Sequence, residues 1–174
     1  MTLDSALAKL IDDSAVIAVV GLLSCHEVDR MRIAQARVLR WIKGAEPAVL
    51  VHYIAEGSWV ADQAGRTPGE TALVFLETVS ASDLEDRGPL RNRPHIRTVS
   101  DHMAGKRIWQ LAHDGHGWMP CRHIQGRHHV VVWRTEVGLT RQLKYIAAPA
   151  PWSELGDAVP LVDLIERVQA RVKR

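Results

Sequence analysis

Short apolar runs, each bounded by turn residues or charges, are the feature that most limits how this chain can fold. The clearest are Ala15–Ser24, Ala48–Ile54, Thr71–Glu77, Lys106–His113, Trp118–Ile124 and His128–Trp133. Runs of this length, rich in Val and Ile and flanked by Gly, Pro or charge, are typical of β-strands. Gly115 and Gly126 each follow a polar residue, which favours hairpin turns. The last three runs therefore predict a three-stranded meander over residues 106–134.

The two ends of the chain have helical spacing instead. Apolar side chains recur at Leu3, Leu7, Leu10 and Ile11 and again at Leu161, Leu164, Ile165, Val168 and Val172. This spacing predicts one helix over residues 2–12 and another over residues 160–172. The segment Arg30–Lys43 fits either a helix or a strand with a β-bulge near Ile33. We favour the strand.

Length and composition agree with this order of elements. The chain has 174 residues, of which 47% are hydrophobic and 24% charged, as in a folded domain. We expect a single domain over residues 1–174, with the β-rich part over residues 15–146. Many short strands between two terminal helices predict a mainly β fold, either a small antiparallel barrel or a sandwich.

Three segments favour the barrel through a resemblance. The stretch AQARVLRWIKG (Ala34–Gly44), then AVLVHYI (Ala48–Ile54), then TPGETALVFLE (Thr67–Glu77) resembles the OB-fold barrels of the tissue-inhibitor-of-metalloproteinases and netrin-module type. The resemblance covers residues 15–78 and implies an OB-like barrel. Together with the two helices predicted from spacing, we expect a small antiparallel OB-like barrel with a helix near each terminus. The chain lacks the N-terminal cysteine and the disulfides of those inhibitors, so the resemblance implies the fold and not the inhibition.

Two cysteines, Cys25 and Cys121, are too few for a disulfide scaffold, and either one bridge or two thiols fits the sequence. No run reaches the roughly 18 apolar residues of a membrane span. The apolar stretch Ala15–Leu23 follows two aspartates rather than the basic residues of a secretory signal. We expect a cytoplasmic protein, or a periplasmic or secreted one if a signal peptide was trimmed.

Histidines and one cysteine gather in the stretch HDGHGWMPCRH. His113, His116, Cys121 and His123 carry imidazole and thiolate groups, which are good zinc ligands, and the turn between them could draw them together. This predicts a metal site at those four residues, with zinc as its metal. The alternative is that they are ordinary hairpin histidines beside a packed thiol. A thiolate pair of Cys121 and His123 is the weaker catalytic alternative.

Charge is unevenly distributed along the chain. Residues 87–144 hold eleven basic residues and three acidic ones, a balance of +8, whereas the remainder holds eleven basic and seventeen acidic ones, a balance of −6. Such a basic segment with interleaved tryptophans predicts binding of an anionic partner. The residues we assign to it are Arg107, Trp109, Arg122, Arg127 and Arg134. The alternative is that the basic middle faces the acidic ends of the same chain.

These observations favour a non-enzymatic β-barrel domain that binds a partner, such as a protein or an anionic surface, or has a structural role. A metal-binding module or metal-dependent enzyme is one alternative, and nucleic-acid binding through the basic middle is the other. No phosphate-binding glycine loop and no nucleophile elbow is present, so we expect no catalytic residues and no cofactor other than zinc. The long polar segment Val79–Gly105 is a candidate lid over the barrel.

Overall fold

The computed structural model describes residues 5–28, 31–44, 48–55, 67–79, 106–113, 115–134 and 143–174. The predicted lid, Val79–Gly105, lies outside these residues except at its first position. Two helices and nine strands form within the described ranges. Their bounds are α1 (Ser5–Asp13), β1 (Val16–Val28), β2 (Met31–Lys43), β3 (Leu50–Ile54), β4 (Thr71–Thr78), β5 (Ile108–Leu111), β6 (Trp118–Ile124), β7 (Arg127–Trp133), β8 (Ile146–Ala147), β9 (Gly156–Pro160) and α5 (Leu161–Val172).

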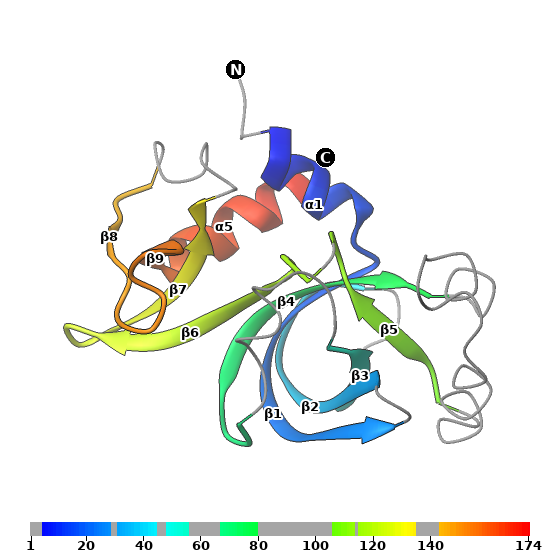
Figure 1. The fold of residues 1–174 in the computed structure, drawn as a ribbon. Helices are drawn as coiled ribbons and strands as arrows, with labels where there is room; N and C mark the ends of the chain where they lie inside the picture. The colour runs from blue at the N-terminus through cyan, green and yellow to red at the C-terminus, as the bar shows by residue number, and fades with distance from the viewer. Residues whose placement is uncertain are drawn as a thin grey trace.

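Five strands close into a barrel, which Figure 1 shows from one end. Their order is β1-β2-β3-β5-β4, and β4 returns to pair with β1 from Val16↔Leu76 to Gly21↔Thr71. The β3–β5 pairing is parallel and the other four are antiparallel, so the barrel is mixed. The expectation of a mainly β barrel with a helix at each end is confirmed, with this one parallel pairing as the difference.

Strands β1 and β2 bend round the barrel because their register shifts at three places. One extra residue interrupts the pairing at Leu23 on β1 and at Leu39 and Ile42 on β2. Such bulges bend a strand and increase its twist. The strand interpretation of residues 30–43 is therefore confirmed. The bulge expected near Ile33 is wrong, because Ile33 pairs regularly with both of its neighbouring strands.

Side chains of the barrel strands alternate between two apolar cores, as the two-residue period of a strand requires. On β1, Val16, Ala18 and Val20 point into the barrel, whereas Ile17 and Val19 point outward. The inward core contains Leu22, Ala34, Ala36, Val51, Tyr53, Ala72, Val74, Leu76, Trp109 and Leu111 from the barrel strands. The barrel is thus filled by side chains over most of its length.

A second sheet extends from the barrel along β6. The first half of β6 pairs with β4, and its second half pairs with β7, followed by β9 and β8. Trp133 on β7 donates a hydrogen bond from its indole nitrogen to the carbonyl of Trp118, at 2.8 Å, and the two rings stack. Both rings belong to the same buried core as the barrel interior. The second sheet therefore packs continuously with the barrel.

The predicted meander over residues 106–134 is half correct. The β6–β7 hairpin turns at Gln125 and Gly126, which both have positive φ, as the sequence predicted. The expected hairpin between β5 and β6 is wrong, because β5 lies between β3 and β4. The chain after β5 folds over β4 instead: Phe75 hydrogen-bonds through its carbonyl to Ala112 and through its amide to Gly117.

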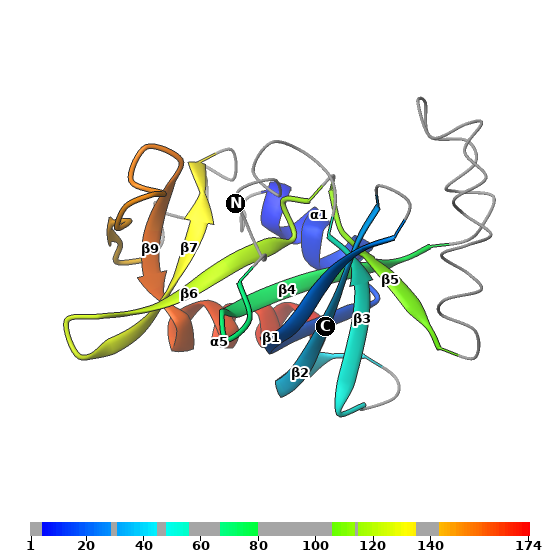
Figure 2. The ribbon, with the colours of Figure 1, turned by 60° about the horizontal axis from the view of Figure 1, so that its bottom comes forward.

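Helices α1 and α5 lie next to each other on the outside of the sheets (Figures 1 and 2). Leu7 and Leu10 of α1 and Leu164 and Val168 of α5 are fully buried there against outward-facing residues of β1, β4, β6 and β7. The predicted helices at both ends are thus confirmed. Neither of the described helices is long and apolar enough to cross a membrane.

Candidate functional site

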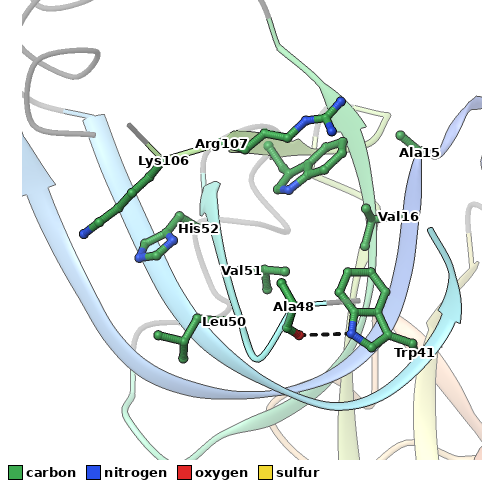
Figure 3. A pocket seen from close by; sticks show the side chains of 10 residues that line it. Ala15, Val16, Trp41, Ala48, Leu50, Val51, His52, Lys106 and Arg107 are labelled. Atoms are coloured by element: carbon green, nitrogen blue, oxygen red, sulfur yellow. Dashed lines mark hydrogen bonds between the residues drawn. The ribbon is translucent and has the colours of Figure 1, made fainter. Parts of the chain in front are cut away.

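A cavity of about 450 Å³ opens at one mouth of the barrel. It forms where β1, β3 and β5 begin and where β2 ends. Its lining residues are Ala15, Val16, Trp41, Ala48, Leu50, Val51, His52, Lys106, Arg107 and Trp109 (Figure 3). Val16, Val51 and Trp109 also belong to the barrel core, so the apolar floor of the cavity is the end of that core. The volume lies in the range of pockets that hold small molecules.

Trp41 forms one wall and is held by contacts with Gly44 and Ala48, which follow β2 in the chain. Its indole nitrogen donates to the carbonyl of Ala48 at 3.0 Å, the dashed line in Figure 3. Gly44, the residue after β2, has a φ of 150°, and a Cβ there would lie 2.8 Å from the indole ring. Glycine at that position therefore lets the ring lie against the backbone at Gly44. The hydrogen bond and the close approach together set the position of this wall.

The opposite wall is basic. The Arg107 guanidinium lies over the Trp109 ring, 4.4 Å from its centre, a cation–π contact. Lys106 and His52 lie near each other in Figure 3. Burial, together with the positive charge of Lys106, lowers the pKa of His52 below its ordinary value. The lowered pKa favours the neutral imidazole, which can both donate and accept a hydrogen bond.

The five residues predicted to bind an anionic partner do not share one surface site. Arg107 and Trp109 line the cavity together, whereas Arg122 lies over the Trp152 ring and 3.6 Å from a Glu70 carboxylate oxygen. Arg134 hydrogen-bonds to the carbonyls of residues 153 and 154 and lies 3.4 Å from Asp157. Arg127 is exposed at the β6–β7 turn. Only the Arg107–Trp109 pair therefore lies at the cavity.

The four residues predicted as metal ligands have separate surroundings. The His113 ring contacts the Asp13 carboxylate at 2.8 Å, and His123 packs edge-on against His128. Cys121 is buried in the outer core, where burial raises the pKa of its thiol to about 12. His116 lies in the turn before β6. Among the described residues no group of three or more His, Cys, Asp or Glu side chains is placed to hold a metal ion.

The catalytic alternative requires a reactive thiolate at Cys121 paired with His123. A thiol with so high a pKa stays protonated at neutral pH, and only the thiolate is a strong nucleophile. His123 lies on the same strand but is exposed. Cys25 and Cys121 are both present as thiols rather than as a bridge. The structure thus leaves Cys121 as a packed side chain.

Sequence reasoning missed Trp41 and His52 as site residues. They come from β2 and β3, and they meet Lys106 and Arg107 only because β5 pairs in parallel with β3. A parallel pairing between strands about fifty residues apart leaves no local motif. The one sequence signal for this site was Trp109 close to the consecutive basic residues Lys106 and Arg107, and the prediction of an anionic partner included two of these three residues.

Fold and cavity together define the class of this protein. It is a five-stranded mixed β-barrel, consistent with OB-like barrels in general, and it carries a cavity of small-molecule size at one mouth. Comparison with protein-family models, with curated proteins and with solved structures finds no match.

Proposed function

We propose that this chain is a non-enzymatic β-barrel binding domain whose ligand enters the cavity at the barrel mouth. The observation that carries the proposal is the cavity itself, which combines an apolar floor, two indole rings and two basic side chains. Binding sites of this kind are concave and mostly apolar, with a few polar groups that orient the ligand. The described lining residues include no carboxylate pair and no thiol or serine that would favour catalysis.

The likeness of residues 15–78 to netrin-module barrels forms part of the same proposal. It is supported by the positive φ of Gly44, just after β2, and of Gly69, just before β4. The netrin likeness concerns the fold alone, and the binding role rests on the cavity.

Two related dyes test the proposed function. N-phenyl-1-naphthylamine is neutral, and 8-anilinonaphthalene-1-sulfonate is its sulfonated counterpart; both gain fluorescence when they leave water. We expect at least one dye to bind at a single site. Ala48→Trp places a large ring at the cavity and should abolish that binding. Val49→Trp is the matched control, because Val49 is 73% exposed and does not line the cavity.

The outcomes are distinct. Loss of dye binding in Ala48→Trp together with wild-type binding in Val49→Trp supports the proposal. Binding of neither dye overturns it, and so does dye binding that Ala48→Trp leaves unchanged. Circular dichroism of both variants shows that they remain folded.

Single-stranded nucleic acid is the second candidate ligand. Arg107 and Trp109, two of the residues predicted for an anionic partner, both line the cavity, and OB-like barrels bind oligonucleotides by stacking bases on aromatic rings. The affinity for an oligothymidine should then fall steeply with salt, with a log–log slope of about −0.7 for each phosphate contacted. Absence of binding at low salt excludes this candidate.

A further inference from the structure

The charges at the cavity are of one sign. Lys106 and Arg107 are exposed at its edge, and none of the described lining residues is acidic. Within the described part of the chain, neither cation forms an ion pair with a carboxylate. Other basic residues differ: Arg122 lies beside Glu70 and Arg134 beside Asp157. Among the described residues, Lys106 and Arg107 thus differ from Arg122 and Arg134 in having no carboxylate beside them.

The rest of the cavity suits an apolar body. Val16 and Val51 are buried in its floor, and the rings of Trp41 and Trp109 line it. Trp109 is 9% exposed, with the Arg107 guanidinium over its ring. An indole ring prefers to pack against another flat ring in an offset or edge-on arrangement. A volume of about 450 Å³ has room for a small molecule of a few rings and is too small for a folded segment of another protein.

The positive charge and the apolar lining occupy different parts of the cavity. The apolar residues lie toward the barrel interior, whereas the Lys106 and Arg107 side chains lie at the solvent edge. The contact of Arg107 with the Trp109 ring also holds its charge at the mouth. A ligand that fits must therefore be amphiphilic, with its apolar part inside and its charge outside.

We propose that the barrel mouth binds a small amphiphilic anion, with a flat apolar ring system against Trp41 and Trp109 and one acidic group at Lys106 and Arg107. This inference rests on the proposed function and adds the chemical class of the ligand. It also assigns separate roles to the two sets of residues. The rings and the floor supply affinity for the apolar body, and the cations select for the negative charge.

The same dye pair tests this class, because the two dyes differ by one sulfonate group. We expect the sulfonate to bind about tenfold more tightly than the neutral dye at low ionic strength, a modest gain because the cations are exposed. The double variant Lys106→Gln/Arg107→Gln should bring the two affinities together without abolishing binding of the neutral dye. Arg127→Gln is the matched control, since Arg127 is exposed outside the cavity. High salt should shrink the preference in the wild type.

The results distinguish the proposed binding function of the cavity from the proposed small-anion class of its ligand. A sulfonate preference that the double variant removes and Arg127→Gln preserves supports the inference. Equal binding of both dyes at a site blocked by Ala48→Trp overturns the anionic class and leaves the proposed function intact. Binding of neither dye overturns the proposed function itself. If an oligothymidine displaces the sulfonated dye far better than thymidine monophosphate does, a polymer is the ligand and the small-anion class is wrong.

Discussion

Leu164→Ala tests whether α5 is an integral part of the fold. Leu164 is fully buried in the core between the helices and the sheets. Alanine lacks three of its carbon atoms, and at about 0.8 kcal/mol for each buried carbon the transfer loss is about 2.4 kcal/mol. Incomplete collapse of the cavity raises the total to about 3 kcal/mol. For a chain of this size, that loss lowers the melting temperature by roughly 6–12 °C.

Urea unfolding followed by circular dichroism measures the loss directly. Val162→Ala on the same helix is the matched control, because Val162 is 58% exposed. Its small loss of buried area is offset by the higher helix propensity of alanine, so we expect a change within about 0.5 kcal/mol. Equal effects of the two substitutions would refute the packing of α5 on the sheets. Dye binding at the barrel mouth should be unchanged in both variants, since neither residue lines the cavity.

Three further predictions concern a turn, a thiol and a histidine. Gly117→Ala should lower the free energy of unfolding by about 1–3 kcal/mol, because a Cβ there meets the Phe75 carbonyl and comes within 2.9 Å of the Ala112 amide nitrogen. A change below about 0.5 kcal/mol in urea unfolding would contradict this close approach. Iodoacetamide at pH 8 should label Cys25 before Cys121, because burial raises the pKa of the Cys121 thiol to about 12. Mass spectrometry should find equal labelling of the two thiols only in denaturant, and equal rates in the native protein would disprove the burial of Cys121. Because the pKa of His52 is lowered in the folded state, unfolding takes up a proton, and the stability falls as the pH drops below about 6.5. His52→Gln should flatten that pH dependence, and an unchanged stability profile would count against a lowered pKa at His52.

Local patterns predicted the elements well because each element depends on its own residues. The apolar repeat around Leu164 predicted the C-terminal helix, and Gly126 after Gln125 predicted the β6–β7 hairpin, where the structure has positive φ at both residues. Strand β9 was missed because Gly156–Pro160 is short and carries little apolar alternation. It becomes a strand through its pairing with β7, which buries Ala158 and Val159.

Local sequence patterns did not predict which strands pair when those strands are far apart in the chain. The alternation of Val16 and Ile17 shows that both faces of β1 are buried, yet it does not show that β4 closes the barrel. The parallel contact of β3 with β5 was equally hidden, and with it the meeting of His52 and Lys106. The candidate site follows from this closure, which explains why only its Arg107–Trp109 side was predicted from the sequence.

The uneven distribution of charge along the chain can be compared with the charged contacts that the structure shows. Three contacts in the described residues join the basic middle to acids outside it: His113 with Asp13, Arg122 with Glu70, and Arg134 with Asp157. This is the self-complementary arrangement that the sequence left open, and it accounts for part of the basic excess. Lys106 and Arg107 belong to the same basic segment but face a cavity whose described lining carries no acid. Among the described residues, the charge pattern therefore ties the middle of the chain to its ends. The two cations at the barrel mouth are the part of the basic excess to which we assign ligand selection in our proposal.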